Sequence, residues 1–158
     1  MVKDKKELFK AITDESILIN PELIWSGELI QDTRYTCENP EFLFNIFLTA
    51  PEMFPKPEQL LILWSTNSNS IVAFLREDKV YIKYYLEDGP SEYEVLGKTY
   101  QQMISNLFAS LIFREVREKD LKVLANTLNF KYLDELASFI SRNDDWEDNT
   151  SKFISEIE

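Results

Sequence analysis

Few residues of this chain have the type and spacing that catalysis requires. Cys37 is the single cysteine, and the sequence contains no histidine. A cysteine nucleophile needs a neighbouring base or cation that lowers the pKa of its thiol, and a serine nucleophile usually needs histidine as its base. The sequence also lacks a G-x-S-x-G motif. We therefore interpret Cys37 as a small, partly buried thiol and expect no catalytic residue.

The sequence predicts neither a cofactor nor a metal site. Its three glycines stand apart and form neither the G-x-G-x-x-G nor the G-x-x-x-x-G-K-[ST] phosphate loop. One acidic cluster offers hard oxygen ligands, but it lacks the alternating spacing and the glycine of an EF-hand loop. We interpret it instead as charge that stabilises the N-terminus of a helix. The cluster consists of Asp144, Asp145, Glu147 and Asp148.

The charge of the chain restricts its partners. The 158 residues include 17 basic and 28 acidic side chains, which give a formal net charge of -11. Residues 38–97 hold four basic and ten acidic side chains, whereas residues 98–142 hold seven basic and five acidic ones. An acidic protein repels nucleic-acid phosphates and attracts basic protein surfaces. We therefore expect a basic protein partner and no nucleic acid.

The hydrophobic pattern changes near residue 98. Residues 60–96 contain short apolar runs separated by turn-forming loops, which predicts an antiparallel β-meander. After residue 98 the apolar residues recur at spacings of three and four, which predicts helices. The length suits one core. We therefore predict a single α+β domain over residues 1–158, with the meander packed against the C-terminal helices.

Local signals predict several helix starts in the second half of the chain. Thr99 and Gln102 have the spacing of a capping box ahead of a strong apolar stripe. Residues 121–142 resemble a helix-turn-helix in spacing, but the second helix begins with acidic residues, which favours a plain helical hairpin over DNA recognition. Asn143 is expected to cap a last helix.

The first third of the chain gives conflicting signals. Residues 4–12 predict a short helix with a narrow apolar stripe. Asn20-Pro21 and Asn39-Pro40 have the form of a helix cap followed by the first helical residue. The run from Phe42 to Leu48 is nevertheless rich in aromatic and branched residues over a short length, so we predict a buried strand there.

Tyrosines and acids gather in the second half of the predicted meander. Alternation along residues 80–86 directs Tyr81, Lys83 and Tyr85 to one face, while four acids lie in or beside a predicted hairpin turn at Gly89. Tyrosine is enriched at protein interfaces, and acids steer basic partners. Burial of this face under the C-terminal helices is the alternative. The predicted partner-binding residues are Tyr81, Lys83, Tyr85, Glu87, Asp88, Glu92, Tyr93 and Glu94.

Residues 60–113 resemble the C-terminal half of SUKH-superfamily proteins. The similarity lies in the strands LLILW, IVAFL and KVYIKYYL, an EDG turn, YEVLGKTY, and a helix of the form Y-x-x-M-I-x-x-L-F. The family's N-terminal pattern, a helix ending near Leu-Pro followed by Tyr and an Asn-Gly pair, is not found. The family includes bacterial toxin-immunity proteins and fungal cell-wall synthesis regulators. The resemblance implies a non-catalytic α+β domain that binds a partner.

We therefore expect a non-catalytic, acidic protein-binding module, for which the resemblance implies a bacterial immunity or inhibitor role. Two alternatives stay open. One is a small-molecule-binding protein or carboxylate-based enzyme with a pocket between sheet and helices, and the other is an inhibitor that mimics nucleic acid. The sequence shows neither a signal peptide nor an apolar run long enough to span a membrane, so we expect a cytoplasmic protein without membrane contact. The oligomeric state stays open.

Overall fold

The computed structural model describes residues 1–66, 69–143 and 145–158, with the side chains of residues 146–148 excepted. Contacts between α-carbons divide the chain into two compact units, Met1–Leu96 and Gly97–Glu158. A four-stranded antiparallel sheet and helices together confirm the predicted α+β class. The packing of the meander against the C-terminal helices within one domain stays a prediction.

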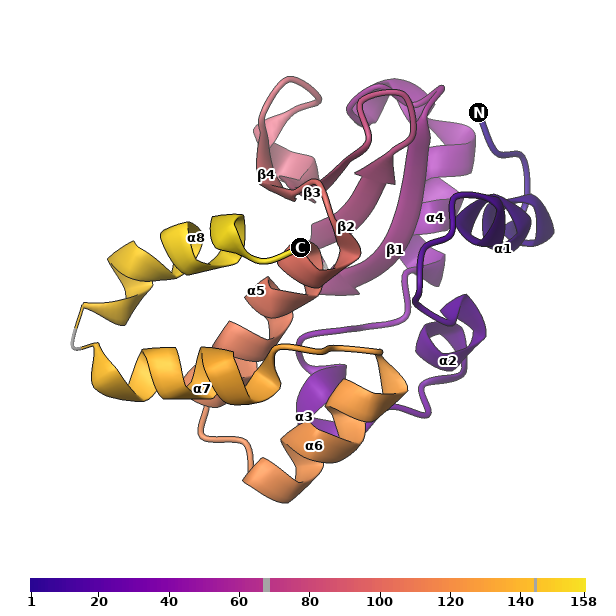
Figure 1. The fold of residues 1–158 in the computed structure, drawn as a ribbon. Helices are drawn as coiled ribbons and strands as arrows, with labels where there is room; N and C mark the ends of the chain where they lie inside the picture. The colour runs from indigo at the N-terminus through magenta and orange to yellow at the C-terminus, as the bar shows by residue number, and fades with distance from the viewer. Residues whose placement is uncertain (67–68, 144) are drawn as a thin grey trace. The chain divides into compact units, whose positions relative to one another are not determined.

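The N-terminal unit is built around the sheet (Figure 1). The strands follow the order of the chain across the sheet, and the first three pair antiparallel, as the predicted meander requires. Their register places Phe74 opposite both Leu61 and Tyr81, so these three side chains share one face. The strands are β1 (Leu60–Thr66), β2 (Ser70–Leu75), β3 (Val80–Tyr85) and β4 (Tyr93–Gly97).

Four α-helices precede the sheet in the chain. The first begins where Asp4 accepts a hydrogen bond from the backbone N–H of Glu7, and it packs beside β1. The second begins as predicted, with Asn20 as its cap and Pro21 as its first residue. The helices are α1 (Lys5–Asp14), α2 (Pro21–Ser26), α3 (Gln31–Arg34) and α4 (Glu41–Thr49), and short 3-10 helices follow at Pro51–Met53 and Leu86–Asp88.

The strand predicted for Phe42 to Leu48 is wrong, because this run forms α4. The side-chain oxygen of Asn39 accepts a hydrogen bond of 2.8 Å from the backbone N–H of Glu41 and so satisfies the start of the helix. Leu43, Phe44 and Phe47 are buried, a spacing that places them on one side of a helix. Nearly every residue of the run is apolar, so its sequence fits the periodicity of a buried strand as well as that of a helix. Packing against the sheet selects the helix.

Aromatic rings connect α4 to the sheet. The ring of Phe54 lies 5.2 Å from that of Phe47 and 6.0 Å from that of Tyr84 on β3, measured between centroids. The hydroxyl of Tyr84 donates a hydrogen bond to the backbone carbonyl of Met53. Burial, with the charge of Asp88 as a smaller cause, raises the pKa of the Tyr84 phenol. These rings form the core that fixes β3 and hence the turn that follows it.

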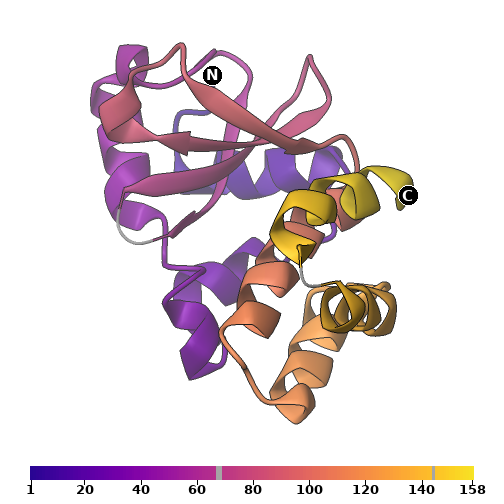
Figure 2. The same cartoon turned by 90° about the vertical axis from the view of Figure 1, so that its left-hand side faces the viewer.

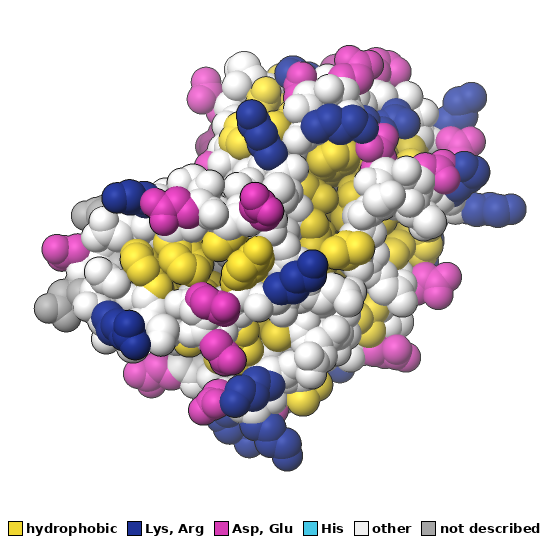
Figure 3. Space-filling model, viewed as in Figure 1, with side chains coloured by type: hydrophobic (Ala, Val, Ile, Leu, Met, Phe, Trp, Pro, Cys, Tyr) yellow, Lys and Arg dark blue, Asp and Glu magenta, His cyan; other side chains and the backbone are white. Residues whose placement is uncertain are grey.

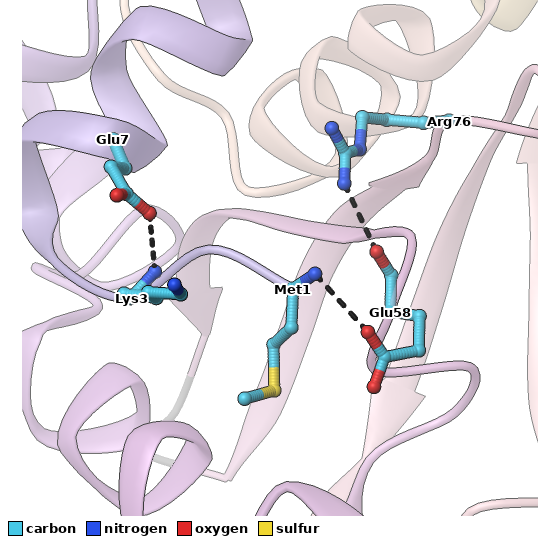
Figure 4. Close-up of polar contacts among 5 residues, drawn as sticks. All are labelled: Met1, Lys3, Glu7, Glu58 and Arg76. Carbon is cyan, nitrogen blue, oxygen red and sulfur yellow. Dashed lines mark hydrogen bonds and ion pairs between the residues drawn. The ribbon is translucent and has the colours of Figure 1, made fainter.

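Polar contacts hold the start of the chain against the loops beside β1 and β2 (Figure 4). The amino group of Met1 lies 3.2 Å from the Glu58 carboxylate, and the Arg76 guanidinium donates to the Glu58 carbonyl oxygen at 3.0 Å. The backbone N–H of Lys3 donates to the Glu7 carboxylate at 2.8 Å. These contacts position the first turn of α1.

The C-terminal unit is helical (Figure 2). Its first helix begins at the predicted capping box, in which the Thr99 hydroxyl accepts from the Gln102 N–H and the Gln102 side chain accepts from the Thr99 N–H. Gln102 also donates to the Ile157 carbonyl at 3.0 Å. The helices are α5 (Tyr100–Phe113), α6 (Glu118–Thr127), α7 (Leu133–Arg142) and α8 (Trp146–Glu156), and α5 contacts both α7 and α8.

Two further sequence predictions concern this unit. The two predicted helices are α6 and α7, and Asn129, with a left-handed φ of 54°, lies between them; the preference for a plain hairpin over DNA recognition stays a prediction. The cap predicted at Asn143 is wrong, since α8 begins after Asp145 and the Asn143 side chain instead donates to the Phe139 carbonyl at 2.7 Å. The helix retains acidic residues near its start, as the sequence indicates.

Gly97 joins β4 to α5 and requires the absence of a side chain. Its φ is 151°, and a Cβ atom there would lie 2.5 Å from the Cβ of Gln102. The same Gln102 side chain accepts a hydrogen bond of 2.8 Å from the Lys98 N–H. The close approach therefore allows the capping box to form directly after the strand.

Candidate functional site

Cys37 is unsuited to nucleophilic catalysis. Its side chain is buried, and burial raises the pKa of the thiol far above its ordinary value. A protonated, inaccessible thiol neither attacks a substrate nor binds a metal. This agrees with the interpretation of Cys37 as a packing residue.

The described side chains form no cluster of metal ligands. Among those side chains, no three of the Asp, Glu and Cys groups lie close enough together to hold a metal ion. Of the acidic cluster noted in the sequence, Asp144 and the side chains of Glu147 and Asp148 lie outside the described residues. The absence of a metal and of a cofactor therefore stays a prediction.

An open cavity of about 630 Å³ runs along α7 in the C-terminal unit. Figure 3 shows hydrophobic side chains gathered between α7 and α8, where Phe139 stacks on Phe153 with centroids 5.0 Å apart. Asp134 and Glu135 line the cavity, but consecutive residues of a helix point about 100° apart, so the two carboxylates do not converge as acid and base. Arg142 lies at the other end of α7. A smaller cavity of about 300 Å³ lies where α6 meets α7.

Four carboxylates lie in or beside the turn between β3 and β4. The 3-10 helix Leu86–Asp88 and Gly89, with a φ of 85°, reverse the chain, and the Glu92 N–H donates to the Gly89 carbonyl at 3.2 Å. Asn69 donates to Glu87 at 3.3 Å. The side chains of all four acids are exposed, and none forms an ion pair with a described cation. The four acids are Glu87, Asp88, Glu92 and Glu94.

The predicted tyrosine face is only partly exposed. Tyr81 is 4% exposed, and its ring lies 4.7 Å from that of Phe74, so the expectation that Tyr81 reaches a partner is corrected. Burial, with a smaller effect of the Glu15 charge, raises the pKa of Tyr81 to about 12. The register of β2 and β3 places Tyr81 directly opposite Phe74, so the two rings pack together on one face of the sheet.

Tyr85 and Tyr93 are half-buried and remain at the surface. The ammonium of Lys83 lies 5.1 Å from the centre of the Tyr85 ring, a cation–π contact. Lys56 is paired with Asp78, and this pair and the neighbouring Tyr93 hydroxyl raise the pKa of Lys56. Seven of the eight predicted residues are exposed or half-buried along β3, the following turn and β4. We call them the acidic β3–β4 surface: Lys83, Tyr85, Glu87, Asp88, Glu92, Tyr93 and Glu94.

Sequence reasoning missed one residue of this region. Val95 on β4 is 55% exposed, although it lies in a strand between Glu94 and the buried Leu96. The signal for it is the alternation Glu92-Tyr93-Glu94-Val95, in which acids and apolar residues take turns. Because Glu94 is exposed as well, side chains on both faces of β4 reach solvent at this point.

Within the described parts of the chain, no helix is long and apolar enough to cross a membrane. Comparisons with protein-family models, with curated proteins and with solved structures find no match. The resemblance to the SUKH superfamily, and the immunity role that it implies, therefore stay predictions.

Proposed function

We propose that this protein is a non-catalytic, acidic module that binds a basic protein through the acidic β3–β4 surface. The observation that carries this proposal is the group of four exposed carboxylates in or beside one turn, without ion-pair partners among the described cations. An immunity or inhibitor role is supported by the SUKH resemblance and by the acidity of the chain.

Unpaired carboxylates on a surface are well suited to steering. Other acids of the N-terminal unit have nearby cations, such as Glu15 with Lys79 at 2.6 Å. None of the four acids in or beside the turn forms an ion pair with a described cation, so no salt bridge cancels their charge. Their field attracts a basic protein and increases its association rate, and salt screens the attraction.

The half-buried tyrosines give the surface its apolar contact area. Tyr85 and Tyr93 flank the turn, each with its ring partly covered by the protein. A ring held in place loses little conformational entropy when a partner covers the rest of it. We therefore assign the acids to the association rate and the tyrosines to the dissociation rate.

The test is affinity capture from the native host's lysate with two charge-reversal variants as baits. One variant changes Glu87, Asp88, Glu92 and Glu94 to lysine. The matched control changes Glu28, Glu77, Glu156 and Glu158 to lysine, which alters the net charge equally at exposed acids without described ion pairs. We expect one basic protein to be captured by the parent and the control and lost by the first variant, with the melting temperatures of both variants near that of the parent.

The captured protein is then used in stopped-flow measurements between 20 and 500 mM salt, roughly a fivefold range in Debye length. Association with the parent should slow as salt rises, while Tyr85→Ala and Tyr93→Ala should mainly increase the dissociation rate. Equal association rates for the parent and the first variant across this range would contradict the proposal. So would equal losses in both charge-reversal variants, since that result would reflect net charge alone.

A further inference from the structure

We propose that β4 holds the partner by strand addition, in which an extended segment with alternating basic and apolar residues pairs with β4 as a further strand of the sheet. This inference rests on the proposed function and specifies how the basic partner is bound. β4 is the last strand in the order of the sheet, so within the described residues no strand lies on its far side. An open strand edge presents backbone N–H and C=O groups to which a second chain can pair.

The exposure of β4 indicates that this edge is accessible. Successive side chains of a strand point to opposite faces of the sheet. Glu94 and Val95 are consecutive residues of β4, and both are exposed. The strand is therefore uncovered on both faces at this point, which leaves room on each face for the side chains of an added strand.

The side chains of this segment define what the added strand must contain. Glu94 and Glu92, the residue before β4, are two positions apart and share one face, while Tyr93 and Val95 share the other. Opposite charges placed directly across two strands stabilise the pairing, as do apolar or aromatic pairs. The complementary segment therefore alternates Lys or Arg on one face with apolar residues on the other.

The same pattern disfavours a second copy of this chain as the occupant. In a two-fold antiparallel pair of β4 strands, positions that share a face meet one another. In a pair centred on Tyr93, Glu92 of one copy would lie opposite Glu94 of the other, and a pair centred on Glu94 would place that residue opposite itself. Like charges directly opposite each other destabilise a strand pair, so the acids favour a basic partner.

The experiment uses the full chain and an acetylated, amidated peptide of sequence Val-Lys-Val-Lys-Val-Lys, with two N-methylated isomers as matched controls. One isomer is methylated on its valines and the other on its lysines. Residues two apart direct their N–H groups to the same edge of a strand, so each isomer blocks one edge only. We expect one isomer to bind at least about tenfold more weakly than the parent peptide and the other within about threefold of it, because a strand pairs through one edge.

Binding is followed by NMR at low salt, together with amide hydrogen exchange of Glu94 and Val95. Consecutive strand residues direct their N–H groups to opposite edges, so one of these two amides faces outward. The peptide should slow exchange at that amide by about tenfold and leave its neighbour nearly unchanged. A variant with Glu92→Gln and Glu94→Gln should bind the peptide several-fold more weakly, whereas Glu28→Gln with Glu77→Gln should not.

Equal binding of both methylated isomers, or loss of binding by both, would overturn strand addition. Absence of binding by the parent peptide at about 1 mM would also overturn it. None of these results touches the proposed function, which is judged separately by whether capture of the host's basic protein depends on the four acids.

Discussion

Among single residues, Tyr81 should make the free energy of unfolding fall at alkaline pH. Its phenol has a pKa of about 12 in the folded protein, against an ordinary value of about 10 in an unfolded chain. The folded state therefore holds this proton more tightly. Its contribution to stability is complete below about pH 10 and is lost as the pH rises to about 12. Urea unfolding between pH 9 and about 12 should show this decline.

The variants Tyr81→Phe and Glu15→Gln separate the causes of this decline. Removing the phenol hydroxyl should make the free energy of unfolding fall less steeply over the same pH range. Glu15→Gln should have a smaller effect, because burial is the larger cause of the raised pKa and the Glu15 charge the smaller one. An identical slope in the parent and Tyr81→Phe would show that other groups produce the decline.

A substitution at Leu107 tests whether the apolar stripe of α5 belongs to the core. It is 5% exposed, in the middle of the helix. Replacing it with alanine should lower the free energy of unfolding by about 2 to 5 kcal/mol, through lost burial and the cavity that remains. The control Val123→Ala, at a side chain that is 51% exposed on α6, should change it by no more than about 0.5 kcal/mol. A similar, small cost for both would place Leu107 outside the core.

At the scale of elements, the start of α5 depends on one hydroxyl. The Thr99 side chain accepts from the Gln102 N–H at 3.2 Å, and this satisfies a backbone group that the helix itself leaves unpaired. Thr99→Ala should cost about 1 kcal/mol and speed amide exchange in the first turn of α5. Thr99→Ser keeps an oxygen acceptor and should lose much less. If serine costs as much as alanine, the methyl group of Thr99 matters and the cap does not.

For the whole molecule, repulsion among the excess acidic side chains destabilises the folded state. Twenty-eight acidic against 17 basic side chains leave a net charge of -11, and the ion pairs described are exposed on at least one side. Raising NaCl from 20 to 500 mM shortens the Debye length from about 20 Å to about 4 Å. The melting temperature should therefore rise by a few degrees, which calorimetry can measure.

Potassium chloride is the control for this salt effect, because screening depends on ionic strength and not on the identity of the cation. Both chlorides should raise the melting temperature equally. A melting temperature that falls with salt would mean that attraction in the ion pairs outweighs repulsion among the acids, contrary to the expectation.

Features that depend only on neighbours in the chain can be predicted from the sequence. The capping box of Thr99 and Gln102, the start of α2 at Asn20 and Pro21, and the meander with its turn at Gly89 are set by hydrogen bonds and backbone preferences within a few residues. The acidic β3–β4 surface was found for the same reason, since its acids lie in and beside one turn. Exposure of polar residues at a turn needs no distant contact.

Three other features depend on contacts between residues that are distant in the chain. The run from Phe42 to Leu48 is apolar at nearly every position, so it fits both a helix and a buried strand. Packing on the rings of Phe54 and Tyr84 selects the helix, and no local pattern reveals these contacts. Tyr81 alternates correctly for an exposed face, but its partner Phe74, on another strand, covers it. Val95 is exposed because β4 ends the sheet. Strand order and cross-strand register join residues distant in the chain, and burial follows from those contacts.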